Sequence, residues 1–264
     1  MGEFSRDEFE RAVQAFRDAP FVEGAMVEGL DLFARAAGGW SSHLMGVSPT
    51  LGLAFDWHAG LTPQSVAEFQ AMGGAIPAVN PRLGWLMEQP MFGITGDHEC
   101  VPEEERASSP FYRDLFVRYD APFCVAARLP GPGDVKVIIG VNRSAAQGPA
   151  GETDKQQIRL LLSHVEGALR VQQALEGHGA MMATQSFEAL SMAAFLCNAW
   201  GRIVGMTPGA ERLVSRGGPL RLNAGQLTAL DAAANVGLQA ALRAACSDPA
   251  NSSVQTRNTS LALT

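Results

Sequence analysis

The sequence lacks the features that mark the most easily recognised enzymes and metal proteins. Its four cysteines, Cys100, Cys124, Cys197 and Cys246, are far apart. No two of them have the spacing of a zinc knuckle or a redox CxxC motif, which favours reduced thiols in a cytoplasmic protein. The G-x-S-x-G elbow of hydrolases and the glycine loops that bind phosphate groups are missing as well. The sequence therefore predicts neither a hydrolase of that kind nor a nucleotide site built on such a loop.

Basic residues and long apolar runs are also scarce. Residues 1–150 carry 19 acidic against 11 basic residues, residues 151–264 carry 8 against 9, and the formal net charge is −7. A domain that neutralises phosphates needs a basic surplus, so direct nucleic-acid binding by this polypeptide is not expected. The apolar runs are too short or too interrupted to cross a membrane, and no secretion signal is recognisable at the start. We expect a cytoplasmic protein without a membrane segment.

The most informative stretch of the chain is residues 135–175. It begins with a run rich in β-branched residues between turn-prone segments, which predicts a buried strand. Residues 153–156 have the form of a capping box, and apolar residues follow at three- and four-residue spacing from Ile158 to Leu175. This pattern predicts a helix of about five turns that covers a sheet with its first half.

The rest of the sequence indicates which helices and strands surround that strand and helix. The expected elements before it are helices near residues 5–20, 22–37, 62–73 and 108–119, strands near 42–46, 52–58 and 122–129, and short helices and loops over 75–97. This order of helices, hairpin, helical middle, hairpin and long helix predicts an α+β fold. We expect an antiparallel sheet with its terminal helices on one face and a more irregular helical layer on the other.

Several segments carry a resemblance to a known family. These segments are residues 33–39, 80–82, 109–116 and 135–175. Together they resemble a GAF-type sensor domain, and more narrowly the sensory N-terminal region of bacterial LuxR-type helix-turn-helix transcription regulators. Residues 194–213, 218–223 and 227–245 resemble a PAS-like domain. The resemblance implies a GAF-like domain over residues 5–175, a long connecting helix, and a smaller PAS-like α+β domain over residues 182–264.

The resemblance also implies partners. Regulators of this type bind DNA through a C-terminal helix-turn-helix domain, which does not follow in this sequence, so we expect a chain truncated before that domain. The apolar stripe over residues 154–175 keeps close to a seven-residue repeat and predicts a homodimer through this helix. The expected ligand is a small-molecule effector, without a cofactor, and the predicted class is a sensor rather than an enzyme.

The effector is expected in a cavity between the sheet and the irregular helical layer. Such a cavity takes large apolar side chains and a few polar ones, the usual composition of a small-molecule site. The candidate ligand-binding residues are Phe55, Trp57, Trp85, Phe92, Tyr112, Phe116 and Phe123, with His43 or His58 as the polar group. This set predicts a small effector that is apolar or aromatic.

Other readings of the sequence remain open. The run His98-Glu99-Cys100 places three ligand-capable side chains together, but adjacent side chains diverge, so a metal site is not predicted there. A thiol enzyme on a GAF scaffold, resembling a methionine sulfoxide reductase, is the main enzymatic alternative, and it would need Cys100 and Cys124 as its close pair. A third alternative is the sensor domain of a histidine kinase or of a cyclic-nucleotide enzyme. Such a domain would bind its effector in the same way as the sensor of a transcription regulator and would differ only in the output domain that follows it.

Overall fold

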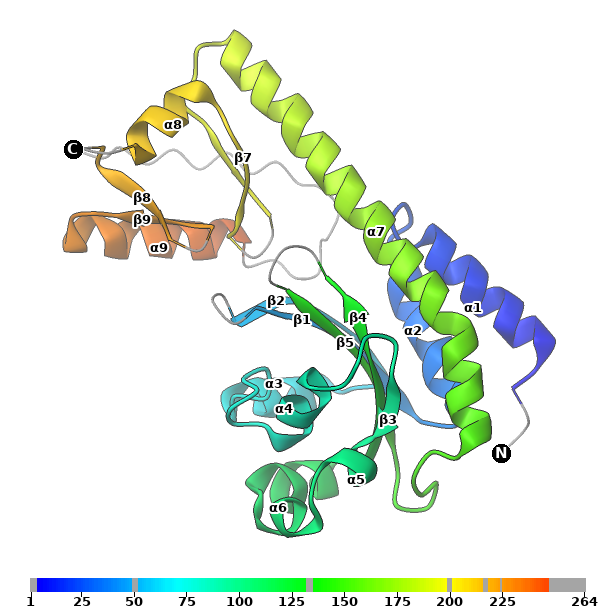
Figure 1. The fold of residues 1–264 in the computed structure, drawn as a ribbon. Helices are drawn as coiled ribbons and strands as arrows, with labels where there is room; N and C mark the ends of the chain where they lie inside the picture. The colour runs from blue at the N-terminus through cyan, green and yellow to red at the C-terminus, as the bar shows by residue number, and fades with distance from the viewer. Residues whose placement is uncertain are drawn as a thin grey trace. The chain divides into compact units, whose positions relative to one another are not determined.

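The computed structural model describes residues 4–48, 52–131, 135–198, 201–215, 218–223 and 225–246. The chain divides into two compact units, residues 1–170 and residues 171–264. The first unit is built on a five-stranded antiparallel sheet in the order β2-β1-β5-β4-β3. One face of this sheet carries α1, α2 and the first half of α7, and the other carries a layer of short helices (Figure 1). The predicted α+β fold with two different helical layers is therefore confirmed.

The two N-terminal helices follow the predicted pattern with one difference. Helix α1 (Arg6–Asp18) starts with the expected capping box, in which Ser5 and Glu8 satisfy each other's backbone N–H groups. Helix α2 (Ala25–Ala36) starts three residues later than predicted, because Gly24 adopts a positive φ of 82° at its N-cap. The inward-facing side chains of these helices are almost completely buried, among them Phe16, Leu30 and Phe33.

The sheet is organised around its two central strands. Strand β1 (Ser41–Ser48) pairs with β2 (Gly52–Ala59) on one side and with β5 (Lys136–Arg143) on the other. Strand β5 also pairs with β4 (Phe123–Pro130), and five consecutive residues of β5 are buried, as its β-branched run predicts. The short edge strand β3 (Ile94–Gly96) pairs with β4. Its three residues lie in the segment predicted to hold only short helices and loops, so that prediction was incomplete. The predicted turn near Pro49 lies outside the described residues.

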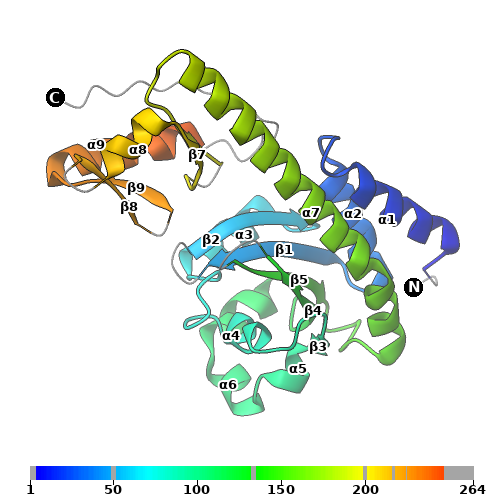
Figure 2. The same ribbon diagram turned by 45° about the horizontal axis from the view of Figure 1, so that its top comes forward.

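Short helices cover the second face of the sheet, as Figure 2 shows from another direction. They are α3 (Pro63–Ala71), α4 (Pro81–Met87), α5 (Asp97–Cys100), α6 (Glu103–Ser108) and a π-helix, η1 (Phe111–Phe116). The helix expected over residues 108–119 is not continuous, because Ser109 is extended with a ψ of 129° and separates α6 from η1. The π-helical turn places two pairs of neighbouring bulky residues, Phe111 with Tyr112 and Leu115 with Phe116, in the buried layer.

The long helix α7 (Glu152–Ala189) begins earlier and extends further than predicted. Its predicted apolar face is confirmed over the first unit, where residues 158, 161, 162, 165, 168 and 169 are each at most 4% exposed. The expected capping box at Thr153 was wrong, because the helix already starts at Glu152. A side chain of the first turn, Asp154, instead accepts a hydrogen bond from the Gly151 N–H at 2.9 Å.

Two ion pairs attach the start of α7 to the first unit. Arg143 of β5 donates to Asp154 at 3.0 Å, and Lys155 donates to Glu99 of α5 at 2.6 Å. The Glu99 carboxylate also accepts the Gly96 N–H at 2.8 Å. The four-residue helix α5 is therefore connected directly to α7.

The second unit is smaller and has its own core. It contains the hairpins β6 (Phe195–Cys197) with β7 (Ile203–Met206) and β8 (Leu220–Asn223) with β9 (Gln226–Ala229), and the helices α8 (Pro208–Val214) and α9 (Ala232–Cys246). Leu220, Leu227 and Leu238 form its buried centre. The predicted domain limits of 5–175 and 182–264 and the PAS-like assignment stay predictions.

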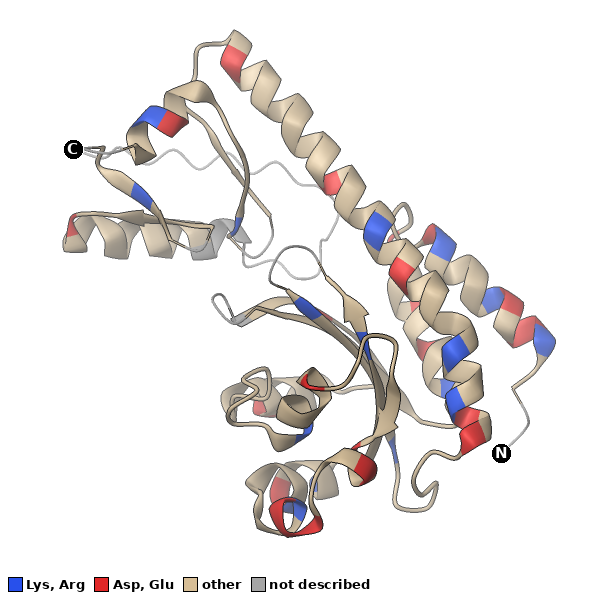
Figure 3. Cartoon of the chain, viewed as in Figure 1, with Lys and Arg blue, Asp and Glu red and all other residues tan. Residues whose placement is uncertain are grey.

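The charges on the first unit do not separate by sign along its longest helices. Basic and acidic residues are mixed along α1 and the first half of α7, while α6 opens with three consecutive acidic residues (Figure 3). Within the part of the chain that the structure describes, no helix combines the length and the hydropathy needed to span a bilayer.

Candidate functional site

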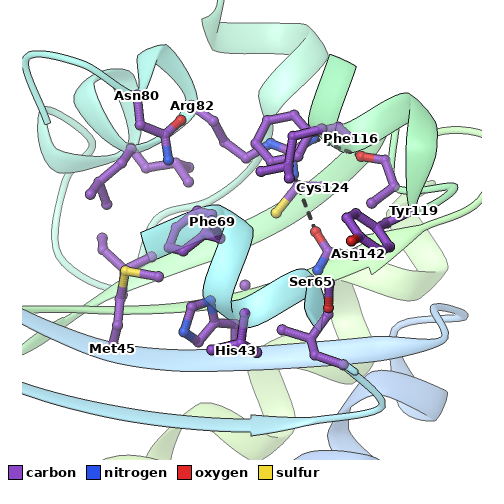
Figure 4. Close-up of a pocket in the computed structure, with 18 of the residues that line it drawn as sticks. His43, Met45, Ser65, Phe69, Asn80, Arg82, Phe116, Tyr119, Cys124 and Asn142 are labelled. Carbon is purple, nitrogen blue, oxygen red and sulfur yellow. Dashed lines mark hydrogen bonds between the residues drawn. The ribbon is translucent and has the colours of Figure 1, made fainter. Parts of the chain in front are cut away.

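A cavity of about 90 Å³ lies between the sheet and the layer of short helices in the first unit (Figure 4). Strands β1, β4 and β5 form one wall, and α3, α4, η1 and their connections form the other. The apolar lining includes Met45, Leu61, Val66, Phe69, Leu83, Leu86, Leu115, Phe116 and Ile138. The polar side chains at the wall include His43, Ser65, Asn80, Arg82, Tyr119 and Asn142. This is the composition of a small-molecule pocket, a mostly apolar space with a few fixed polar groups.

Asn80 is one of the wall residues whose hydrogen bonding is incomplete. It precedes Pro81 at the start of α4 and is only 2% exposed. Its Nδ2 donates to the Gly74 carbonyl at 2.8 Å, which fixes the amide plane. Its Oδ1 is buried and has no hydrogen-bond partner among the described residues. A buried acceptor left unpaired costs about 1–3 kcal/mol, so a donor brought into the cavity would be stabilised there.

Arg82 is buried in the same wall and is 6% exposed. Its guanidinium lies 3.6 Å from the centre of the Phe116 ring. Its Nε donates to Asp97 Oδ2 at 2.9 Å, its Nη2 to the Ala121 carbonyl at 2.9 Å, and its Nη1 to Asn142 Oδ1 at 3.2 Å. Donors on all three nitrogens are therefore used within the protein.

Asp97 compensates the charge of Arg82. It is 0% exposed, and its Oδ2 also lies 2.8 Å from Arg82 Nη2. The same oxygen accepts from the Tyr112 hydroxyl at 3.0 Å, and Oδ1 accepts from the Cys124 N–H at 2.9 Å. Burial alone would lower the pKa of Arg82, but the Asp97 carboxylate outweighs it and holds that pKa above its ordinary value. Arg82 therefore keeps its positive charge in this buried position.

His43 belongs to a second polar group at the edge of the cavity. Its Nε2 is hydrogen-bonded to Asp56 Oδ1, and its ring packs edge-on against Phe69 with centroids 5.6 Å apart. Burial alone would raise the pKa of Asp56, but the hydrogen bond and charge of His43 outweigh burial and lower it. Burial lowers the pKa of His58, the cross-strand neighbour of His43. These three residues occupy one sheet face, because directly paired residues project to the same side.

Two of the eight residues predicted to bind the effector line this cavity, namely His43 and Phe116. The cross-strand pairs of β1 and β2 explain why Phe55 and Trp57 do not. His43 pairs with His58 and Met45 pairs with Asp56, so these even-numbered residues of β2 share the cavity face. Because side chains alternate along a strand, Phe55 and Trp57 project from the opposite face. Their rings contact each other there, with centroids 4.8 Å apart.

The other four predicted residues lie around the cavity without lining it. Trp85 is 40% exposed, and its Nε1 donates to Glu105 at 2.9 Å. Phe92 has a positive φ of 60° and is 43% exposed. Tyr112 is buried beside Arg82, and Phe123 packs edge-on to His98 with ring centroids 6.4 Å apart. Whether any of the eight residues contacts an effector stays a prediction.

The two thiols required by the enzymatic alternative belong to one cluster, since Cys100 packs against a core that includes Cys124. Burial raises the pKa of the Cys100 thiol to about 11 and that of the Cys124 thiol to about 12. A thiol acts as a nucleophile only as its thiolate, so these values disfavour redox catalysis by this pair. Among the described residues, no three His, Cys, Asp or Glu side chains come together as a metal site would require.

Comparisons with known proteins give likeness in fold. No family model matches the chain, and no curated protein matches it. The VqsR LBD domain from Pseudomonas aeruginosa is similar at 13% identity and a TM-score of 0.45, covering 64% of this chain and 94% of that one. The N-acylhomoserine lactone dependent LuxR family transcription factor CepR2 from Burkholderia cenocepacia is 11% identical with a TM-score of 0.47, over 64% and 96% of the two chains.

SdiA from Escherichia coli is also similar, at 14% identity and a TM-score of 0.45, over 70% of this chain and 84% of that chain. SdiA in complex with octanoyl-rac-glycerol gives a TM-score of 0.47 at the same identity, over 73% and 85% of the two chains. These structures thus include an LBD domain and a LuxR family transcription factor. At this level of identity the likeness concerns the path of the backbone and carries no information on the ligand.

Proposed function

We propose that the first unit is the effector-binding domain of a cytoplasmic bacterial transcription regulator of the LuxR type. Its ligand is a small, mostly apolar molecule that enters the cavity between the sheet and the short helices. The observation that carries this proposal is the unpaired Oδ1 of Asn80 in a mostly apolar wall. The resemblance of the sequence to the sensory region of such regulators supports the class of protein.

The cavity and its wall define what the ligand must offer. Its volume of about 90 Å³ is of the same order as the ~150 Å³ engineered cavity that holds a benzene ring. An effector with one ring or a short chain suits this space. It needs an O–H or N–H group to donate to Asn80, since burial of that oxygen without a partner is unfavourable. It needs few other polar groups, because apolar side chains line most of the space.

The first prediction concerns this hydrogen bond. We expect phenol, benzyl alcohol and hexanamide to bind the full chain at least about tenfold more tightly than toluene, which has no donor, because tenfold corresponds to about 1.4 kcal/mol. In Asn80→Leu the difference between donors and toluene should disappear. Two-dimensional ¹H–¹⁵N NMR titrations measure these affinities.

The matched control is Trp85→Ala, which removes a predicted ligand contact that lies outside the cavity. It should leave all four affinities unchanged. The proposal is wrong if none of the compounds binds, or if Trp85→Ala weakens binding while Asn80→Leu does not.

The proposal includes a homodimer through α7, on a different side of the helix from the apolar stripe of the sequence prediction, whose residues Ile158 and Val165 are buried in the first unit. Leu160, Val171 and Leu175 are 57%, 40% and 43% exposed. At 100° per residue these three positions fall on one side of the helix, away from the buried stripe of Ile158 and Val165. A second copy of the same stripe would cover them.

Light scattering at micromolar concentration should therefore give twice the chain mass of 28.0 kDa. The variant Leu160→Asp/Leu175→Asp should give the single-chain mass, because it places charges in the apolar stripe. Phe21→Asp, a change at a 69% exposed position outside α7, is the control and should stay dimeric. A single-chain mass for the unmodified protein would exclude this dimer.

A further inference from the structure

The cavity wall contains a buried arginine, Arg82, whose charge is balanced by Asp97 inside the protein. Arg82 follows Asn80 and Pro81, so the start of α4 brings the unpaired acceptor and the guanidinium to the same wall (Figure 4). An arginine at a pocket wall usually indicates an anionic ligand, since its N–H groups match carboxylates and phosphates. The surroundings of Arg82 indicate the opposite preference.

The in-plane donors of the guanidinium point to protein groups. Asp97, Asn142 and the Ala121 carbonyl accept from its three nitrogens at 2.9, 3.2 and 2.9 Å. One face of the guanidinium lies against the Phe116 ring at 3.6 Å. These bonds use three of the five guanidinium N–H donors, so a ligand carboxylate would compete with protein groups for the paired hydrogen bonds that arginine offers.

Asp97, which supplies the opposite charge, is fixed by hydrogen bonds as Arg82 is. Asp97 is 0% exposed and accepts from Tyr112 and from the Cys124 N–H in addition to Arg82. These bonds come from η1 and from β4, so three separate elements fix the carboxylate. The wall therefore presents a neutral ion pair that does not reorganise easily.

A charged ligand would lose its hydration on entering the cavity and would meet no uncompensated charge in return. An anion would also be repelled by Asp97, and a cation by Arg82. An uncharged ligand neither loses the hydration of a charge nor is repelled by Asp97 or Arg82. This reasoning rests on the proposed function, because it describes the selectivity of the same cavity.

We infer that Arg82, with its charge neutralised by Asp97, is a specificity-determining residue that makes the cavity select uncharged effectors. Asn80 recognises a donor on the ligand, and the Arg82–Asp97 pair excludes ligands that carry a net charge. Substituting Asp97 would expose the charge of Arg82 and convert the cavity into an anion site.

The test uses two compounds of matched size that share one phenolic donor. They are 4-hydroxybenzamide, which is neutral, and 4-hydroxybenzoate, which is an anion at pH 7.5. We expect the full chain to bind the amide at least tenfold more tightly than the carboxylate. In Asp97→Asn the carboxylate should gain at least tenfold relative to the amide. Tyr112→Phe, which removes one hydrogen bond to Asp97 but no charge, should keep the preference of the unmodified protein.

The outcomes separate this inference from the proposed function. Equal affinity of the unmodified chain for both compounds, or binding of neither while phenol binds, would overturn charge selection and leave the effector site in place. No binding by phenol, benzyl alcohol or hexanamide would remove the effector site, and the selectivity with it. If Asp97→Asn does not fold, the comparison of the two compounds on the unmodified protein decides the question.

Discussion

Asp97→Ala is expected to destabilise the first unit by about 3–5 kcal/mol, because removing one partner of a buried ion pair leaves the other charge uncompensated. Arg82 would lose its counter-ion while staying 6% exposed, and the Cys124 N–H and the Tyr112 hydroxyl would lose their acceptor. Arg82→Met should cost a similar amount, since it leaves the Asp97 carboxylate buried without its cation. Urea unfolding followed by circular dichroism measures both losses.

The double variant Arg82→Met/Asp97→Ala distinguishes an ion pair from two independent contributions. It should lose clearly less than the sum of the two single variants, with a coupling of about 2 kcal/mol or more. The exposed pair Arg11–Glu28, with side chains 60% and 55% exposed, is the matched control. Glu28→Gln should change the free energy of unfolding little. Additive losses at positions 82 and 97 would contradict the pairing on which the selectivity of the cavity depends.

The second large effect is expected in thiol chemistry. With pKa values of about 11 and about 12, Cys100 and Cys124 would hold roughly a hundredfold and a thousandfold less thiolate at pH 7.5 than thiols with a pKa near 9. Iodoacetamide reacts with the thiolate, so both cysteines should be alkylated at least about a hundredfold more slowly than in the unfolded chain. Mass spectrometry of the Cys197→Ser/Cys246→Ser variant follows these two sites alone.

Alkylation by iodoacetamide in guanidinium chloride supplies the reference rate, because both thiols are exposed to solvent in the unfolded chain. Fast alkylation of Cys100 or Cys124 in the folded protein would contradict the described burial. It would also restore the thiol enzyme as the leading alternative. Slow alkylation favours a binding domain, since a redox catalyst on this scaffold needs an accessible thiolate.

The order and layers of the fold could be predicted from local patterns. Three local patterns each predict one element of the structure. The Ser5 capping box predicts α1, the β-branched run predicts β5, and the apolar spacing after Ile158 predicts α7. The short edge strand β3 could not be predicted, because three residues carry no periodicity and pair with β4 only in the folded sheet.

The cavity residues were harder to predict for two different reasons. Trp57 and His58 are neighbours on one strand, so alternation allows only one of them to face the cavity, and the sequence alone did not show which. Arg82 gave no signal, because arginine is usually exposed and its burial depends on Asp97, fifteen residues away. The unpaired oxygen of Asn80 is likewise visible only once Gly74 has taken the amide nitrogen.

The position of a bound ligand tests the central claim most directly. Intermolecular nuclear Overhauser effects between phenol and the methyl groups of the full chain report which side chains surround the ring. We predict contacts to Met45, Leu83 and Leu86, which line the cavity, and their loss in Asn80→Leu. Contacts confined to residues outside the cavity, such as methyl groups near Trp57 or Phe92, would contradict the assignment of this cavity as the effector site.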